Sequence, residues 1–205
     1  MPPPAQMNGR DADQLDAGRT LRYFLGLGSN LGSKAGNLAE AVRRLEARGV
    51  RVLKASSLYK TEPVDVPDQP WFVNAVVLVE SGLRPERLLD LLQDIERGMK
   101  RRRGRSKGPR LIDIDLLLAG RRVIRTRRLV VPHPRLAARR FVLVPLAEIA
   151  PRAVHPVLRR SVEILRRDVA DGSLVIKRPG AFWTPAKRIR PGRPAKEFPH
   201  DQSRT

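Results

Sequence analysis

Apolar residues recur along this chain with two different periods, and these periods predict alternating strands and helices. Continuous or alternating apolar runs predict strands over 22–27, 50–59, 71–81 and within 108–120. Apolar residues three and four positions apart predict helices over 35–48 and 84–99. The order β-α-β-β-α-β predicts an α+β fold, a ferredoxin-like α/β sandwich with a mainly antiparallel sheet and helices packed on it.

After residue 120 the apolar pattern is less regular. A hairpin is expected after residue 120, then a short helix and an apolar segment within 136–151, and a last helix within 155–169. The strand at 71–81 is continuously apolar, which predicts a central position covered on both faces. We therefore expect an extension over 1–19, one folded domain over 20–176, and a basic, proline-rich tail over 177–205.

Composition limits the class of protein. A hydrophobic fraction of 41% is sufficient for a core, and the chain has no cysteine, which excludes disulfides and thiolate metal sites and agrees with the cytoplasm. No apolar run reaches the roughly 20 residues of a membrane span, and no secretory h-region is visible. The net charge of +20 favours polyanions such as nucleic acid, anionic lipid or nucleotide phosphates, but does not decide between them.

Two carboxylates interrupt the apolar run "GPRLIDIDLLLAG". Asp113 and Asp115 are two residues apart in a predicted strand, so they project from the same face while Ile112, Ile114 and Leu116 face the core. Neighbouring carboxylates repel each other, and a hard divalent cation such as Mg²⁺ removes that conflict. The alternative is an exposed strand face on which both aspartates pair with arginine.

A basic stretch precedes the two aspartates. Residues 97–110 contain eight Arg or Lys, with glycines at 98, 104 and 108. A cationic loop beside a two-carboxylate metal site suits phosphoryl transfer, because arginine binds phosphate in a bidentate manner. A solvated basic loop or a nucleic-acid patch would have the same composition.

Other candidate positions lie elsewhere in the chain. Phe72 and Asn74 share a strand face and could stack against and hydrogen-bond a planar heterocycle, or else serve packing and loop capping. His133 stands between two prolines, near Arg128, Arg139 and Phe141. The glycines of "GLGSNLGSK" match no phosphate-binding motif and are expected to serve a tight turn.

These segments resemble the 6-hydroxymethyl-7,8-dihydropterin pyrophosphokinase family of folate synthesis. The resemblance spans about residues 22–165 and rests on "GLGSNLG", "SSLYKTEPVDVPDQPWFVNAV", "GPRLIDIDLLLAG" and "RLVVPHPRLAARRFVLVPLAEIAP". It implies transfer of pyrophosphate from ATP to the hydroxymethyl group of the pterin, with release of AMP. The chain departs from many members at Asp65 and Lys107.

The resemblance also implies residue roles. Asp113 and Asp115 would bind two Mg²⁺ ions, and the phosphate-contacting arginines would be Arg101, Arg103, Arg110 and Arg139, with Arg102 and Arg105 as alternatives in the loop. The ATP side would comprise Gln93, Glu96, Arg128 and His133. The pterin would lie between Phe72 and Phe141, with Asn74, Thr61 and Val64 completing its pocket.

Two other functions stay open. An RNA-binding module of ferredoxin-like fold would explain the charge, but only 4% of residues are aromatic and no aromatic cluster marks a central strand. A different metal-dependent phosphoryl or nucleotidyl transferase would share the aspartate pair and lack the pterin pocket. Small-molecule substrates, no membrane partner and a monomeric state are the expectations.

Overall fold

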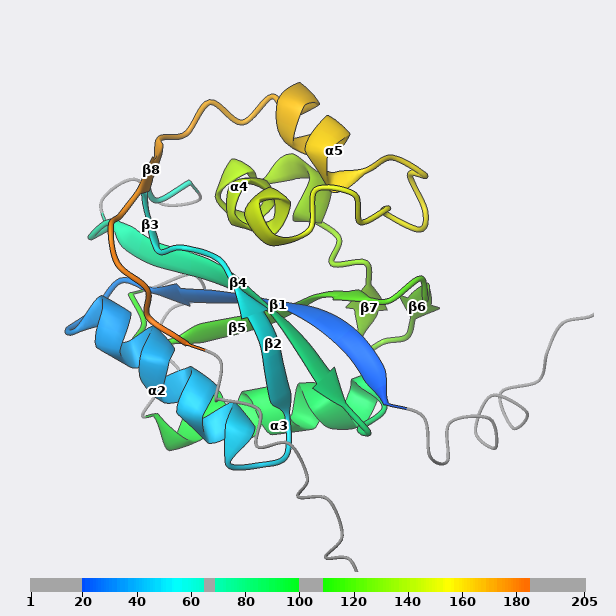
Figure 1. The fold of residues 1–205 in the computed structure, drawn as a ribbon, viewed down its shortest axis with the longest axis horizontal. Helices are drawn as coiled ribbons and strands as arrows, with labels where there is room; N and C mark the ends of the chain where they lie inside the picture. The colour runs from blue at the N-terminus through cyan, green and yellow to red at the C-terminus, as the bar shows by residue number, and fades with distance from the viewer. Residues whose placement is uncertain (1–19, 65–68, 100–108, 185–205) are drawn as a thin grey trace, which may run out of the picture.

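The computed structural model describes residues 20–64, 69–99 and 109–184. The predicted fold class is confirmed, because the first six elements follow the expected order with the second strand divided in two (Figure 1). The elements are β1 Leu21–Ser29, α2 Lys34–Glu46, β2 Arg51–Ala55, β3 Tyr59–Thr61, β4 Phe72–Ser81, α3 Pro85–Gly98, β5 Asp113–Ala119, β6 Ile124–Arg125, β7 Val130–Val131, the 3₁₀ helix η1 Leu136–Ala138, α4 Arg140–Ile149, α5 Val162–Asp168 and β8 Val175–Lys177.

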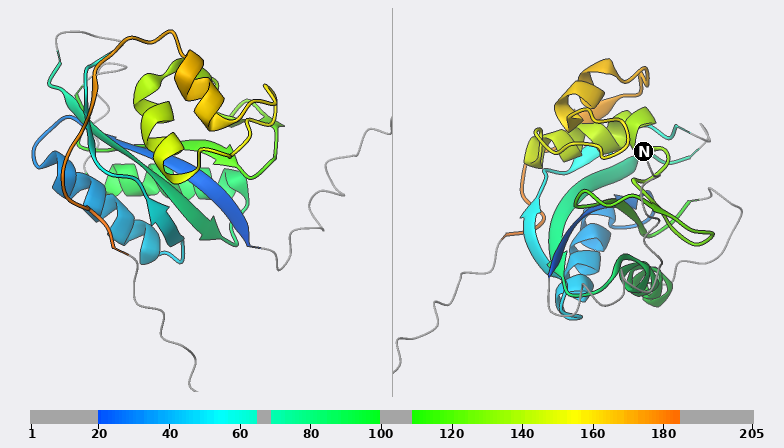
Figure 2. Two further views of the ribbon diagram at one scale, coloured as in Figure 1. Left: turned by 45° about the horizontal axis from the view of Figure 1, so that its top comes forward. Right: turned by 90° about the vertical axis from the view of Figure 1, so that its right-hand side faces the viewer.

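The sheet is antiparallel at every pairing that the structure describes. Its order is β5-β1-β4-β3-β8, and β2 also pairs with β4, so β4 is central as predicted. Helices α2 and α3 cover one face of the sheet, and α4 and α5 lie over the other (Figures 1 and 2). Each face therefore has its own apolar core, and alternate residues of one strand belong to different cores.

The helices under the sheet form where apolar spacing predicts them. In α3, Leu88, Leu92 and Ile95 are fully buried, and Pro85 occupies the first turn, where its missing N–H costs no hydrogen bond. Leu38, Val42 and Leu45 bury the matching stripe of α2. Both helices therefore fix the lower face of β1, β4 and β5.

The prediction of a single strand over 50–59 is wrong, because the structure has two strands there. It is divided into β2 and β3 at Ser56, whose hydroxyl accepts a hydrogen bond from the Val76 N–H at 3.0 Å and donates to the Ser57 carbonyl at 2.8 Å. A serine side chain that bonds the backbone competes with regular pairing, so the chain bends here. The bend brings β3 and the segment after it toward the upper face of the sheet.

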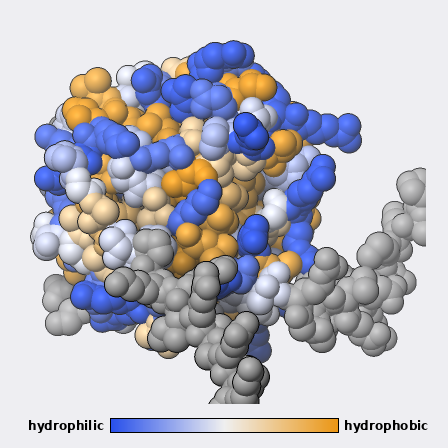
Figure 3. Space-filling model, in the orientation of Figure 1, coloured by the Kyte–Doolittle hydropathy of each residue, from blue (hydrophilic) through white to orange (hydrophobic). Residues whose placement is uncertain are grey.

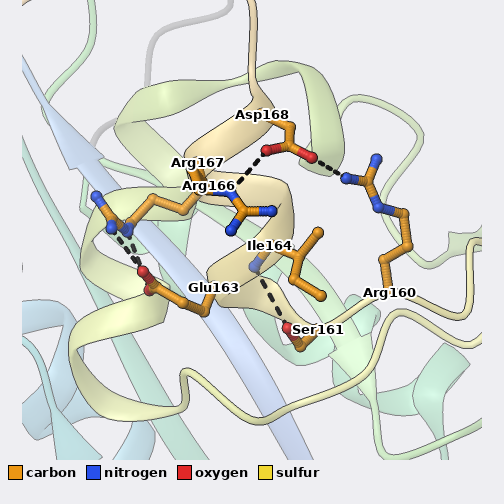
Figure 4. A network of polar contacts seen from close by, with 7 residues as sticks. All are labelled: Arg160, Ser161, Glu163, Ile164, Arg166, Arg167 and Asp168. Carbon is orange, nitrogen blue, oxygen red and sulfur yellow. Dashed lines mark hydrogen bonds and ion pairs between the residues drawn. The ribbon is translucent and has the colours of Figure 1, made fainter.

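The last helix is shorter than the predicted 155–169. Residues 154–161 instead form a tight hairpin closed by a bridge between Val154 and Ser161, with Arg159 at φ 54°. Helix α5 begins after Ser161, whose hydroxyl accepts the Ile164 N–H at 3.3 Å (Figure 4). Glu163 pairs with Arg166, and Asp168 pairs with Arg160 and Arg167, so surface arginines here are matched locally by acids.

The C-terminal strand β8 was not predicted. It pairs with β3 in antiparallel register, Thr61 opposite Val175, and it crosses the domain boundary drawn after residue 176. Beyond it, Phe182 and Trp183 pack against the core, and the Trp183 Nε1–H donates to Glu46 at 3.1 Å. Strand β8 has only three residues, which are too few to give a periodic pattern in the sequence.

The surface of the described residues carries both hydrophilic and apolar side chains (Figure 3). On the face in Figure 3, hydrophilic side chains alternate with apolar ones. Among the residues that the structure describes, no helix has both the length and the apolar character that crossing a bilayer requires.

Buried His155 makes stability depend on pH. Its side chain is 7% exposed, and its Nδ1 accepts the Leu158 N–H at 3.1 Å. Burial lowers the pKa of His155 below its ordinary 6.5. As the pH falls below 6.5, His155 takes up a proton in the unfolded chain before it does so in the folded chain. The free energy of unfolding therefore falls as the pH decreases.

We expect the Tm of the wild type to fall more between about pH 7 and pH 5 than that of His155→Asn, whose amide oxygen can still accept the Leu158 bond. Thermal unfolding followed by circular dichroism measures both. Equal pH dependence in the two proteins would contradict this role of His155.

Candidate active site

A pocket of about 730 Å³, including its open mouth, lies on the upper face of the sheet beside the start of α4. Its floor is β1, where Gly26 and Gly28 face the pocket between β4 and β5. The expectation that these two glycines serve a turn is therefore wrong, because both lie within the strand. Gly32, at φ +58°, serves the turn.

Gly28 is required by its neighbour on β4. A Cβ on Gly28 would lie 2.6 Å from the Asn74 Oδ1, whereas a Cβ on Gly26 would meet only Leu117 at 3.5 Å. The Asn74 Nδ2 donates to the Thr61 Oγ1 at 2.7 Å, and both side chains are buried. The amide of Asn74 is thus held in one orientation, with its oxygen over the bare backbone of β1.

The aspartate pair is where the spacing places it. Asp113 and Asp115 both line the pocket, whereas Ile112, Ile114 and Leu116 are buried beneath the sheet, as predicted. The Arg110 guanidinium pairs with the Asp113 carboxylate at 2.9 Å and lies over the Phe72 ring, 5.5 Å from its centroid. One arginine thus links a carboxylate to an aromatic wall.

The start of α4 provides the opposite wall. Arg139 lies over the ring of Phe141, 5.3 Å from its centroid, and both residues line the pocket. The pocket therefore has two aromatic rings, Phe72 and Phe141, each with a guanidinium within cation–π distance. Thr61, the last residue of β3, and Val64, shortly after it, also line the pocket.

Asn30 was missed by the sequence analysis. It is 1% exposed, its Oδ1 accepts the Arg110 N–H at 2.7 Å, and its own N–H donates to the Arg110 carbonyl at 3.2 Å. Its Nδ2 donates to the Gln69 side chain at 3.1 Å, at the pocket rim. Asn30 therefore holds the backbone of Arg110, and the sequence shows only an asparagine directly after a strand, with nothing that indicates its partner.

His133 lies close enough to Asp115 and Arg139 for their charges to act on its pKa. Burial lowers that pKa below 6.5, so the imidazole is neutral at pH 7. Its Nδ1 accepts the Arg135 N–H at 3.2 Å, which leaves the proton on Nε2. His133 is thus a neutral donor beside the pocket.

None of the four residues expected on the ATP side, His133 included, is among those that line the pocket. Glu96 is 7% exposed and its Oε1 accepts the Ile114 N–H at 2.8 Å, so it ties α3 to β5. Arg128 pairs with Asp90 of α3 at 2.5 Å, and Gln93 is exposed on the same helix. Arg101 and Arg103 lie outside the described residues.

This geometry can bind a flat polar ring between aromatic walls, next to paired carboxylates and two guanidinium groups. The described residues contain no cluster of three or more His, Cys, Asp or Glu, so the protein offers a cation two carboxylates and no complete cage. Fold and site together define a small α+β domain whose pocket suits a flat heterocycle beside a polyphosphate.

Comparison with known proteins identifies a family of pyrophosphokinases. The sequence profile of the family described as 7,8-dihydro-6-hydroxymethylpterin-pyrophosphokinase matches residues 24–151. The 2-amino-4-hydroxy-6-hydroxymethyldihydropteridine pyrophosphokinase of Methylorubrum extorquens is 48% identical over 134 residues, 65% of this chain and 85% of the relative. That of Bacillus subtilis is 46% identical, covering 62% of this chain and 76% of the relative.

Longer relatives match over one part only. The folic acid synthesis protein fol1 of Pneumocystis carinii is 41% identical across 72% of this chain, which spans only 20% of that protein's length. Among solved structures, a Plasmodium falciparum HPPK-DHPS triple mutant with STZ-DHP superposes with a TM-score of 0.59 at 18% identity, over 73% of this chain and 43% of that one. This likeness supports the fold.

The chain belongs to the 7,8-dihydro-6-hydroxymethylpterin-pyrophosphokinase family. The resemblance found in the sequence is confirmed, and with it the class of enzyme, a pyrophosphokinase of folate synthesis.

The pocket floor gives a matched pair of variants. We expect Gly28→Ala to weaken binding of the ring by about 1–3 kcal/mol, roughly 5- to 150-fold in Kd, because its Cβ displaces the Asn74 amide. Gly26→Ala should change the Kd much less, since its Cβ makes only an ordinary contact. Titration calorimetry with the pterin measures both, and equal losses would contradict the role given to Gly28.

Proposed function

We propose that this chain transfers the β,γ-pyrophosphoryl group of ATP to the hydroxymethyl oxygen of 6-hydroxymethyl-7,8-dihydropterin, releasing AMP. The observation that carries the proposal is the convergence in one pocket of a buried Asn74–Thr61 pair, two aromatic rings and the Asp113–Asp115 pair. A pterin needs the first two features, and a polyphosphate with its metal needs the third.

The pterin ring would lie between Phe72 and Phe141. Its amide-like edge would meet Asn74, which lines the pocket and whose nitrogen is engaged by Thr61. Backbone groups around Thr61 and Val64 would complete the edge. A ring bound by buried polar groups is well discriminated, because an analogue without the matching groups leaves them unpaired.

The carboxylate pair fits Mg²⁺. Asp113 and Asp115 are hard oxygen donors from one strand face, and two carboxylates leave the remaining positions of a small octahedral ion for water and phosphate oxygens. Bound there, two Mg²⁺ ions would neutralise charge on the phosphates during transfer. Asp113 already has Arg110 at 2.9 Å, so the carboxylate and the guanidinium would share the phosphate end of the pocket.

The cationic side chains would hold the rest of the ATP. Arg110 and Arg139 approach the pocket from opposite sides, over the Phe72 and Phe141 rings. Arg101 and Arg103 of the basic stretch are proposed to contact the phosphates as well. Gln93, Glu96, Arg128 and the Nε2–H of His133 are proposed for the nucleotide side.

The chemistry is an in-line displacement. The hydroxymethyl oxygen forms a bond to the β-phosphorus while the bond from that phosphorus to the oxygen bridging to the α-phosphorus breaks, and AMP leaves with that oxygen. The hydroxyl proton passes to solvent, because the two aspartates would be committed to cations. The arginines contribute by matching the charge of the transferred group and of AMP. The proposal also includes a monomeric state and a cytoplasmic location. The lack of cysteine is consistent with the reducing cytoplasm.

An RNA-binding function is the second candidate, favoured by the +20 charge. It does not account for two carboxylates in the pocket, since they repel phosphate unless a cation intervenes. Arginines on α5 pair with nearby acids, so part of the positive charge is matched where it stands (Figure 4).

The test is AMP formation from ATP, Mg²⁺ and 6-hydroxymethyl-7,8-dihydropterin. We expect pterin-dependent AMP, and a kcat lower by about a thousandfold in Asp113→Asn and in Asp115→Asn, since charge stabilisation by the cation supplies several kcal/mol. Asp168→Asn makes the same chemical change on α5 and should retain full activity.

ADP as the product, or AMP formed equally well without pterin, would refute the proposal. A salt-sensitive shift of RNA that both aspartate variants retain, with no AMP from the wild type, would favour the second candidate.

A further inference from the structure

Residues 171–177, here called the strap, run along the upper side of the molecule between α5 and β3, ending in β8 (Figures 1 and 2). The strap lies beyond residues 24–151, which the family profile matches. None of its residues is among those that line the pocket. Its hydrogen bonds nevertheless reach two separate walls of that pocket.

The first wall is the segment after β3. The Leu174 N–H donates to the Glu62 carboxylate at 2.9 Å, and the Glu62 N–H donates to the Leu174 carbonyl at 3.3 Å. Directly before this pair, Thr61 is opposite Val175 in the β3–β8 ladder. Thr61 and Glu62 line the pocket, so the strap fixes their backbone from outside.

The second wall is the first turn of α4. The Asp171 Oδ2 accepts the Arg140 N–H at 2.8 Å, and its Oδ1 accepts the Ser173 N–H at 2.9 Å. Arg140 stands between Arg139 and Phe141, which both line the pocket. No side chain of α4 caps this end, so Asp171 provides an acceptor and a favourable charge at the positive end of the helix dipole.

The charge of Asp171 is well held. Burial alone would raise its pKa, but the hydrogen bonds from Ser173 and from the Arg140 backbone outweigh burial and keep the pKa below its ordinary value. Asp171 is therefore ionised throughout the neutral range, and its bond to α4 is charge-assisted.

The far end of the strap also joins β3 to α4. The Lys177 Nζ donates to the Glu148 Oε1 at 2.9 Å, and Glu148 accepts from the Ser57 N–H at 2.8 Å and from the Tyr59 hydroxyl at 3.0 Å. Burial, followed by this carboxylate, raises the pKa of Tyr59 to about 12, so its hydroxyl remains a donor. The strap thus contacts α4 at Arg140 and at Glu148, and it pairs with β3 between these two contacts.

We propose that the strap is a positioning element for the heterocycle: it sets the spacing between the Thr61–Val64 wall and the Arg139–Phe141 wall. The inference rests on the proposed function. The ring gains most when Phe141, against its face, and the backbone of Thr61 to Val64, along its edge, are both held in place before it binds, because the ordering cost then falls on folding rather than on binding. Asp171 is the deciding residue, since it touches no pocket atom and acts only through α4.

The experiment compares Asp171→Ala with the wild type in titration calorimetry of the pterin, with α,β-methylene-ATP and Mg²⁺ present, and in steady-state kinetics. We expect the pterin Kd and the KM for pterin to rise about tenfold, as for loss of a hydrogen bond to a charged group. The KM for ATP and kcat should change less than the KM for pterin, because Asp113 and Asp115 lie on β5 and Arg110 is held by Asn30, so that of the proposed phosphate contacts only Arg139 adjoins the first turn of α4.

Two comparisons separate positioning from general stability. Asp168→Ala removes an equally acidic side chain that pairs only with surface arginines, and it should leave the pterin Kd unchanged. Asp171→Asn retains one amide oxygen as an acceptor and should recover most of the affinity. Glu62→Ala removes the acceptor of the Leu174 N–H at the other wall, and Glu62→Gln should restore it. This pair tests the role of the strap if Asp171→Ala does not fold.

Outcomes that overturn the inference are clear. A lower Tm with unchanged pterin Kd, or equal increases of both KM values, would make the strap a stabilising segment only. A wild type that forms no pterin-dependent AMP would refute the proposed function, whereas an active wild type with unaltered Asp171→Ala affinity would refute only the role of the strap.

Discussion

The pocket exists because one face of β1 has no side chains where β4 and β5 flank it. Gly28 pairs with Asn74 on one side and with Asp113 on the other, so its missing Cβ leaves the space that the Asn74 amide occupies. In an antiparallel sheet, directly opposite residues are close neighbours on the same face. The bare strand therefore brings the proposed ring-binding amide and the first carboxylate next to each other, separated only by backbone.

Arg110 then joins the two halves of the site. Its guanidinium is 2.9 Å from Asp113 and lies over Phe72, while its backbone is held at both polar groups by Asn30. Since Asn30 follows β1 directly, the strand that provides the floor also fixes the approach of the chain to β5. The acid pair, the aromatic wall and the glycine floor are thus positioned by one strand and the residue after it.

The parts of the site that sequence could predict are those set by the local geometry of a strand. The two-residue period places Asp113 with Asp115, and Phe72 with Asn74, and both pairs line the pocket as expected. The contacts that could not be predicted join distant residues: Asn30 with Arg110 across 80 positions, Asp171 with Arg140 across 31, and Leu174 with Glu62 across 112. Each uses a common polar residue whose partner no local pattern indicates. The glycines of β1 were misinterpreted for the same reason, since their neighbours belong to other strands.

The net charge of the chain does not locate the site. Several arginines far from the pocket are matched by nearby acids, as Arg166 is by Glu163 and Arg160 by Asp168, and such exposed pairs contribute little free energy and attract no ligand. The two pocket arginines differ in their setting: Arg110 and Arg139 each lie over an aromatic ring on the edge of a partly enclosed space that also contains carboxylates. There the guanidinium groups are held by flat surfaces and partly shielded from water, so their charge acts at short range on whatever enters the pocket. In the proposed function, selectivity for a small heterocycle over a nucleic-acid duplex would follow from the shape of the pocket, because a base stacked within a duplex cannot enter between two phenyl rings.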